Sequence, residues 1–132
     1  LEDTDAGGIV YYVNYLRFME RARTELLRAL GFDFVSLEHQ GFKFVVYKAQ
    51  VEYHRPARMD DQLFISAHPI KLARTHVVFQ QDVYRHQTLL CSAQVQVACV
   101  TSNSMRPTAM PASLRDAFEK AATIAGETSK IS

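Results

Sequence analysis

A carboxylate, two glycines and the start of a helical pattern follow one another near the beginning of the chain. Asp5 precedes Gly7 and Gly8, and an amphipathic segment begins at about Asn14. Glycine lets a ligand approach the main chain closely, and helix N-termini carry unpaired N–H groups with partial positive charge. Such groups stabilise a carbonyl oxygen that is becoming negative. An acid or base beside them suits acyl transfer, although a tight turn with Asp5 solvated or capping is an equally good alternative on chemistry alone.

Apolar residues at helical spacing predict one long helix over about 14–30. The residues of its buried face are Leu16, Met19, Arg23, Leu26, Leu27 and Leu30, and most charged residues lie elsewhere. Asn14 is suited to the N-cap, and Gly31 is suited to the position just past the C-terminal end. This helix would place its N-terminus a few residues after Asp5.

Alternating apolar residues predict four strands after the helix, at about 45–53, 63–67, 77–83 and 89–99. The segment from Arg55 to Asp61 interrupts the pattern, as does the segment from Pro69 to Arg74. Pro111 would open a short terminal helix, and residues 126–132 form a frayed tail in this interpretation. The order indicates an α+β fold, with a four-stranded antiparallel meander packed by one face on the long helix.

The chain has 132 residues, of which 48% are hydrophobic, so we expect a single domain over 1–132. Because it begins at Leu1, a truncated first strand is an open alternative. A formal net charge of +1 does not call for nucleic acid, and no apolar run approaches the roughly 20 residues of a membrane span. Cys91 and Cys99 lie in one predicted strand, too far apart to bridge. A cytoplasmic location without a metal site is therefore expected, and uncovered sheet edges predict at least a homodimer.

The segment D-T-D-A-G-G-I-V-Y-Y-V-N-Y, from Asp3 to Tyr15, followed by L-R-F-M-E-R-A-R-T-E, closely resembles the opening of the hotdog-fold acyl-CoA thioesterases. It is most similar to the Tol-Pal-associated branch, with the 4-hydroxybenzoyl-CoA thioesterases as near relatives. Further similarities are F-V-V at 44–46 and Y-H-R-P-A-R-M-D-D at 53–61. The resemblance implies a long central helix wrapped by a curved antiparallel sheet. It also implies homodimers or homotetramers with active sites at the dimer interface, an acyl-CoA substrate and no bound cofactor.

The resemblance also assigns roles to individual residues. Asp5 matches the catalytic aspartate, which attacks the thioester carbonyl or activates a water, and the backbone N–H of Tyr12 matches the donor to the thioester oxygen. Many members of the Tol-Pal branch have histidine where this chain has Tyr12, and tyrosine with a pKa near 10 is a poor base at neutral pH. We expect the substrate-binding residues to be Gly8, Tyr15, Arg58 and Arg74. A partner in the envelope machinery is implied by resemblance only.

Other kinds of site have less support in the sequence. Asp3 is interpreted as structural, and the five histidines are scattered over loops and polar faces. A G-x-S-x-G elbow is absent, and D-x-D-x-x-G is a poor match to a calcium loop. A hotdog dehydratase lacks the expected His partner near Asp5. The main alternative to hydrolysis is a non-catalytic acyl-CoA-binding or protein-interaction module on the same fold, which Tyr12 in place of histidine favours.

Overall fold

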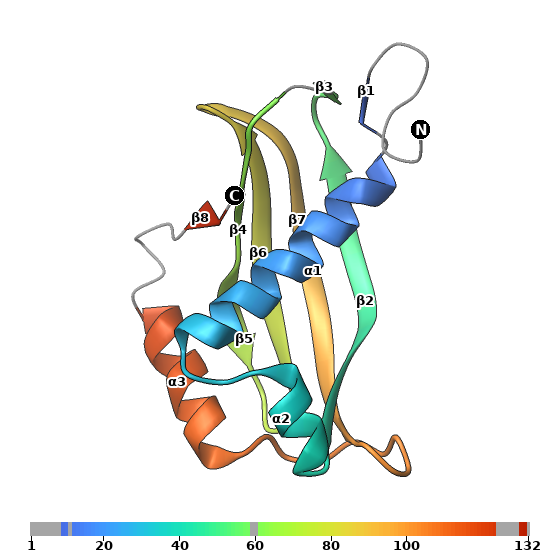
Figure 1. The fold of residues 1–132 in the computed structure, drawn as a ribbon, viewed down its shortest axis with the longest axis vertical. Helices are drawn as coiled ribbons and strands as arrows, with labels where there is room; N and C mark the ends of the chain where they lie inside the picture. Colours follow the sequence, from blue (N-terminus) through green and yellow to red (C-terminus); the bar gives the residue numbers. More distant parts are fainter. Residues whose placement is uncertain (1–8, 11, 59–60, 124–129, 132) are drawn as a thin grey trace.

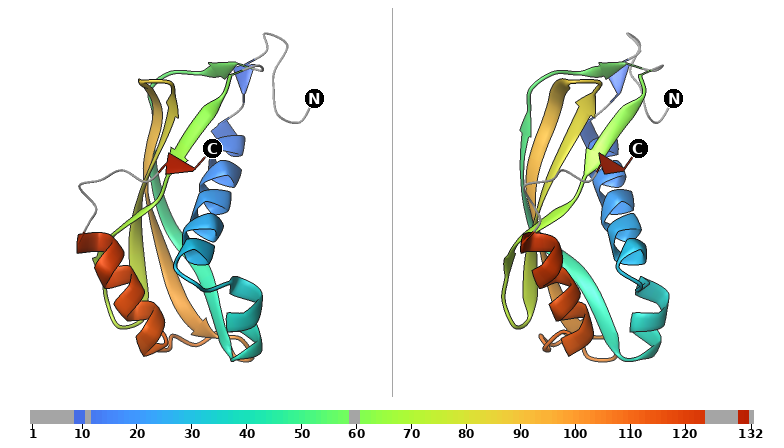
Figure 2. Two further views of the ribbon diagram at one scale, coloured as in Figure 1. Left: turned by 60° about the vertical axis from the view of Figure 1, so that its left-hand side comes forward. Right: turned by 90° about the vertical axis from the view of Figure 1, so that its left-hand side faces the viewer.

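A long helix lies against the concave face of a curved antiparallel sheet (Figures 1 and 2). The computed structural model describes residues 9–10, 12–58, 61–123 and 130–131. Its elements in order are β1 (Ile9–Val10), α1 (Tyr12–Ala29), α2 (Phe34–His39), β2 (Phe42–Tyr53), β3 (Ala57–Arg58), β4 (Leu63–Ser66), β5 (His68–Leu72), β6 (His76–Arg85), β7 (Thr88–Thr101), α3 (Ala112–Thr123) and β8 (Lys130–Ile131). The α+β class and the helix-on-sheet arrangement are confirmed.

The main sheet has the strand order β2-β7-β6-β4-β8, with β5 also paired to β6, and β1 pairs separately with β3. The predicted meander is therefore wrong at its first step, because β2 pairs with β7 and not with β4. The break in the strand pattern predicted from Arg55 to Asp61 contains β3, and the described residues around it are 54–58 and 61–62. Strand β3 lies near one end of the sheet, between the end of β2 and the start of β4 in the chain (Figure 1).

Helix α1 begins at Tyr12, two residues before the predicted start, so the N-cap assignment of Asn14 is wrong. Gly31 follows the helix with φ of 91°, as expected of a residue just past a C-terminus. The helix buries Met19, Ala22 and Leu26 in the same core as the apolar side chains of β6 and β7. Among the described residues, no helix combines the length and apolar character needed to cross a membrane.

Sequence analysis missed α2 and β5, as well as the two-residue strands β1, β3 and β8. Helix α2 begins after Asp33, whose carboxylate caps it by accepting a 2.8 Å hydrogen bond from Ser36 N. Strand β5 contains Pro69, and its pairing with β6 shifts register between Pro69 and Lys71. Proline is tolerated there because, within the described chain, β5 is paired on one side only.

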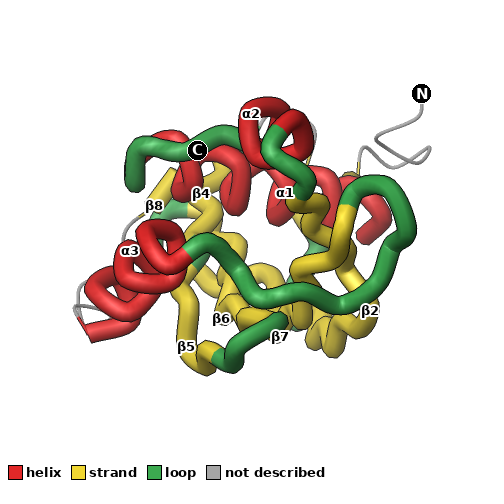
Figure 3. Tube along the Cα trace, turned by 90° about the horizontal axis from the view of Figure 1, so that it is seen from below, coloured by secondary structure: helices red, strands yellow, loops and turns green. Residues whose placement is uncertain are grey.

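The C-terminal part covers the sheet beside β5. Helix α3 begins one residue after Pro111, whose carbonyl accepts from Arg115 N at 3.0 Å, and Phe118 packs edge-on to Phe79 at 5.7 Å between ring centroids. Seen from below, α3 lies on the side of β5, apart from α1 and α2 (Figure 3). Within the segment interpreted as a frayed tail, Lys130–Ile131 instead pair with β4, while 126–129 and 132 lie outside the described residues.

Candidate active site

The chain enters α1 directly from a short paired strand. In β1, Ile9 pairs with Arg58 and Val10 with Ala57, and α1 begins two residues later at Tyr12. The first N–H groups of a helix have no carbonyl partner within the helix. The backbone amide of Tyr12 therefore belongs to the set that can donate to a developing oxyanion. Asp5 and Gly8 lie outside the described residues, so the roles of all three residues stay predictions.

Tyr15 lies one turn into α1 and is only 2% exposed. Its hydroxyl donates to the carbonyl of Arg55 at 3.3 Å, and its ring stacks on Tyr53 with centroids 6.1 Å apart. Burial raises the pKa of Tyr15, so the phenol is neutral near pH 7. The structure places this side chain inside the protein, where it joins α1 to the end of β2, and the predicted contact with substrate is untested.

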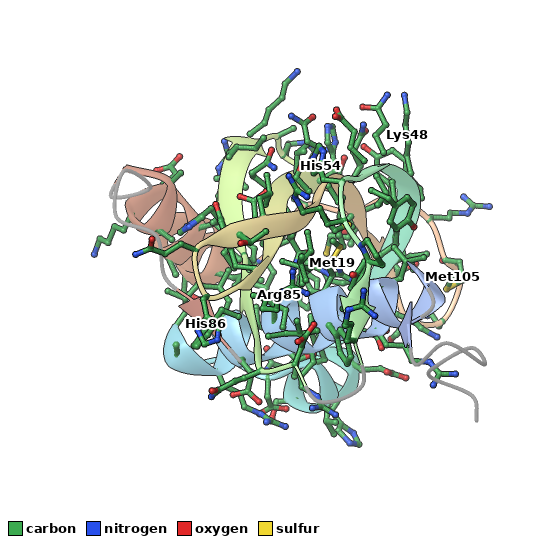
Figure 4. The ribbon with its side chains drawn as sticks, turned by 90° about the horizontal axis from the view of Figure 1, so that it is seen from above. Met19, Lys48, His54, Arg85, His86 and Met105 are labelled. Atoms are coloured by element: carbon green, nitrogen blue, oxygen red, sulfur yellow. The ribbon has the colours of Figure 1, made fainter. Side chains whose placement is uncertain are left out.

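Asp61 holds the chain just after β3. Its Oδ2 accepts from the backbone N–H of Arg58 at 2.7 Å and from Nη1 of Arg85 at 2.9 Å. The hydrogen bond from the Arg58 amide, followed by the Arg85 guanidinium, lowers the pKa of Asp61. Arg85 is the last residue of β6, and Figure 4 looks onto this end of the molecule. Sequence analysis missed the pair because its members are 24 residues apart and no local pattern connects them.

The structure does not bring Arg58 and Arg74 together within one chain. Arg58 is joined through Asp61 to Arg85, the C-terminal end of β6. Arg74 lies in the turn just before β6, where its carbonyl accepts from Met110 N at 3.2 Å. Ten strand residues, His76–Arg85, separate the two positions, which corresponds to about 30 Å. Both side chains are exposed at opposite ends of the sheet.

A pocket of about 330 Å³ lies between α1 and β4. Its lining combines apolar side chains with a charged and polar rim, and consists of Phe18, Arg21, Ala22, Asp61, Gln62, Leu63 and Ile65. Asp61 connects this rim to β3 through its hydrogen bond with Arg58. The pocket is thus large enough and apolar enough to take a small acyl group.

A buried polar network joins α1 to the middle of the sheet. Arg23 donates from Nη1 to Oε1 of Gln81 at 2.8 Å, and burial lowers the pKa of Arg23.

Among the described residues, no group of three or more His, Cys, Asp or Glu side chains is arranged to hold a metal ion.

Residues 7–92 match the family model described as the Thioesterase superfamily. The chain belongs to this superfamily. Among its relatives, the Acyl-CoA thioester hydrolase YbgC of Escherichia coli O6:H1 is 44% identical over 120 residues, which cover 90% of each chain. The Acyl-CoA thioesterase YbgC of Haemophilus influenzae is 42% identical over 118 residues, 89% of this chain and 87% of the relative.

Solved structures of proteins named as thioesterases share the fold. A DHNA-CoA thioesterase from Staphylococcus aureus superposes with a TM-score of 0.85 at 20% identity, covering 94% of this chain and 86% of that chain. A probable thioesterase from Bartonella henselae superposes with a TM-score of 0.77 at 32% identity, covering 83% of this chain and 90% of that chain. The predicted resemblance to hotdog-fold thioesterases is thereby confirmed, and this thioesterase-superfamily chain is an enzyme. Its association with Tol-Pal proteins stays a prediction.

Proposed function

We propose that this thioesterase hydrolyses acyl-CoA thioesters to a free acid and coenzyme A. The observation that carries the proposal is that α1 begins at Tyr12, directly after the strand that follows the D-T-D-A-G-G segment. Two relatives with more than 40% identity, both named for acyl-CoA thioester hydrolysis, support the substrate class.

In the proposed reaction, the thioester carbonyl lies against the N-terminus of α1 and its oxygen accepts from the Tyr12 amide. Asp5 acts in one of two ways. As a nucleophile, its carboxylate attacks the carbonyl carbon, the tetrahedral intermediate expels the coenzyme A thiolate, and water hydrolyses the resulting anhydride. As a general base, it takes a proton from a water that attacks the same carbon. Both routes need the charge on the carbonyl oxygen to be stabilised.

The binding roles follow from the same proposal. Gly8 allows the substrate to approach the main chain, and Arg58 and Arg74 attract the phosphates of coenzyme A. The pocket between α1 and β4 takes the acyl group, because its lining includes the apolar side chains of Phe18, Ala22 and Leu63. Neither a cofactor nor a metal is part of this scheme.

We also propose that β2 joins two copies of the chain. This 12-residue strand pairs only with β7 in the described structure, so its other edge has unpaired backbone groups. The side chain of Val46 is 45% exposed beside that edge, and Tyr53 is exposed as well. Pairing two β2 edges would cover both, in a homodimer or in a homotetramer built from such dimers. A cytoplasmic location, compatible with two buried free cysteines, completes the proposal.

Substitution of Asp5 tests the reaction. Asp5→Asn removes the charge and basicity of the carboxylate at nearly constant size, so we expect turnover to fall by about 10²- to 10⁴-fold while the fold is kept. Thiol release from short, long and aromatic acyl-CoAs measures it. Asp116→Asn, an exposed change on α3, is the matched control and should keep full turnover. Near-native turnover of Asp5→Asn would refute the assignment.

The second candidate is a non-catalytic acyl-CoA-binding or protein-interaction module. The observation that favours it is Tyr12, where a histidine could activate water and a tyrosine at neutral pH cannot do so readily. The same panel of acyl-CoAs separates the two functions, because binding without any thiol release supports the module. Tyr12→Phe should leave turnover unchanged if only the backbone amide acts.

A further inference from the structure

The main sheet has an outer face that is turned away from α1. Gln81 of β6 donates to the Met19 carbonyl of α1, so the alternate residues Gln80 and Asp82 point the other way. In Figure 3, α1 and α2 lie on the inner side of β2, β7 and β6, and in Figure 4 the side chain of Lys48 on β2 extends away from α1. The outer face of these three strands therefore lies opposite the layer formed by α1 and α2.

Cross-strand register arranges this outer face in three rows. From β2 through β7 to β6, the rows are Lys48–Gln96–Val78, Gln50–Gln94–Gln80 and Glu52–Ser92–Asp82. The middle row consists of three uncharged amides, which help to line a hollow of about 320 Å³. One flanking row has an ammonium group and the other has two carboxylates. The outer face thus has a positive end, a neutral centre and a negative end.

The charges on β2 lack partners of opposite sign in their own chain. Lys48 and Glu52 are both exposed, and neither belongs to an ion pair within the described part of the molecule. They lie four residues apart on one strand, a separation of about 13 Å, which is too long for them to pair with each other. A surface that pairs with both must have the opposite charges at the same spacing.

A second copy of the chain has such a surface. A two-fold axis along the middle row, perpendicular to the strands, brings the positive row of one copy against the negative row of the other. Lys48 then lies opposite Glu52 of the second copy, and the symmetry produces this pair twice. Each amide of the middle row faces its own counterpart, and because an amide both donates and accepts, it can hydrogen-bond to itself across the axis.

We propose that the outer faces of two chains stack in this way and that β2-paired dimers thereby assemble into a homotetramer. The inference rests on the β2 pair proposed above, which it extends by a second interface, and it does not depend on the reaction. Three strands about 4.8 Å apart, each with about six residues at 3.3 Å, cover about 290 Å² per chain. Two stacked pairs contribute four such faces, so the stack buries about 1,100 Å², just above the ~1,000 Å² expected of a specific interface.

Charge reversal tests the stack. Lys48→Glu and Glu52→Lys each place like charges opposite one another, so each should raise the dimer–tetramer dissociation constant by about 100-fold or more. Sedimentation velocity at low salt measures it, with circular dichroism as the check on folding. Lys120→Glu on α3 and Glu38→Lys on α2 are matched controls at exposed positions and should remain tetrameric. Tetramers in both outer-face variants, or dimers in the controls as well, would overturn the proposal.

Mixing the two outer-face variants separates loss of complementarity from damage to the fold. The Lys48→Glu chain has carboxylates at both positions, and the Glu52→Lys chain has ammonium groups at both. An equimolar mixture should therefore form tetramers that neither variant forms alone. The double reversal Lys48→Glu/Glu52→Lys restores opposite charges within one sequence and should be tetrameric as well. Dimers in the mixture and in the double reversal would overturn the stack.

The stack and the β2 pair fail in different ways, because Val46→Lys changes only the edge of β2. A tetrameric parent that becomes a dimer with Lys48→Glu, and a monomer with Lys48→Glu and Val46→Lys together, contains both interfaces. A dimeric parent that becomes a monomer with Val46→Lys keeps the β2 pair and overturns the stack, which leaves the outer face to a different partner. A dimeric parent that dissociates with Lys48→Glu but not with Val46→Lys supports the stack and overturns the β2 pair. A monomeric parent overturns both.

Discussion

Gln81 on β6 reaches across to α1 and donates from Nε2 to the backbone carbonyl of Met19 at 2.9 Å. The same amide contacts the carbonyl of Ser66 at 3.3 Å, and its oxygen accepts from Arg23. Gln81 has no exposed surface. A single buried side chain on β6 therefore links the long helix to β6 and β4 by hydrogen bonds, within an otherwise apolar core.

Replacement of Gln81 should destabilise the protein markedly. Gln81→Leu leaves the partly buried guanidinium of Arg23 and the Ser66 carbonyl without this partner, so we expect the free energy of unfolding to fall by about 2–3 kcal/mol. Urea denaturation followed by circular dichroism measures it. Gln94→Leu, at an exposed position on β7, is the matched control and should change the free energy by less than about 0.5 kcal/mol.

Removing Arg23 as well should restore part of that loss. In Arg23→Met/Gln81→Leu, the partly buried cation that lacks its Gln81 partner is gone, so the double variant should be more stable than the sum of the single changes predicts. Additive losses in the same urea experiment would show that Arg23 and Gln81 act independently.

Asp61 should make stability depend on acid pH. Its folded-state pKa lies below the ordinary value of 3.8, because the charged form accepts from Arg58 N and Arg85. The contribution of Asp61 is therefore fully present above about pH 4 and is lost as the pH falls through the lower folded-state pKa. Thermal unfolding between pH 5 and pH 2.5 should show a smaller acid loss for Asp61→Asn than for the parent. Parallel curves would contradict this assignment.

The two cysteines should be unreactive in the folded protein. Burial raises the pKa of Cys91 to about 12 and that of Cys99 to about 11. At pH 8 about one Cys91 side chain in 10⁴ would be the reactive thiolate. Reaction with a chromogenic disulfide should therefore proceed at the rate of unfolding and become complete at once in concentrated urea. Rapid labelling of the native protein would show that β7 opens locally.

A charge on β2 should weaken the proposed dimer. Val46→Lys places an ammonium beside the unpaired edge of β2, and we expect dissociation at concentrations where the parent is associated. Sedimentation velocity measures the state. Ile70→Lys on β5, where the residue is likewise 45% exposed, introduces the same charge on a strand that pairs with β6 and should leave assembly unchanged. Identical behaviour of the two variants would exclude β2 as the interface.

The elements with long periodic patterns could be predicted from the sequence, because α1, β6 and β7 bury one face over many residues. The strands β1 and β3 could not be predicted, because a strand of two residues is too short to show an alternating pattern. Strand β5 was missed because Pro69 indicates a break in a strand, unless the strand is known to lie at the edge of a sheet.

The residues of the candidate site were singled out in the sequence, and their roles stay predictions. The segment from Asp5 to Tyr12 resembles a known motif, and the structure adds that α1 begins at Tyr12. The contacts of Tyr15 with Arg55, 40 residues apart, and of Asp61 with Arg85 depend on how the chain crosses the sheet. Such long-range partners leave no mark in the local sequence, so their residues could be singled out but their roles could not.

The location of Arg58 and Arg74 at opposite ends of β6 has a consequence for stoichiometry. Antiparallel pairing of two β2 edges around a two-fold axis places each end of one sheet beside the opposite end of the other. If both arginines contact one coenzyme A, the ligand spans two subunits and every dimer holds two composite sites. Mixing Arg58→Ala chains with Arg74→Ala chains would then form heterodimers in which one site has both arginines and the other has neither. Complementation between two impaired parents would reveal this shared architecture.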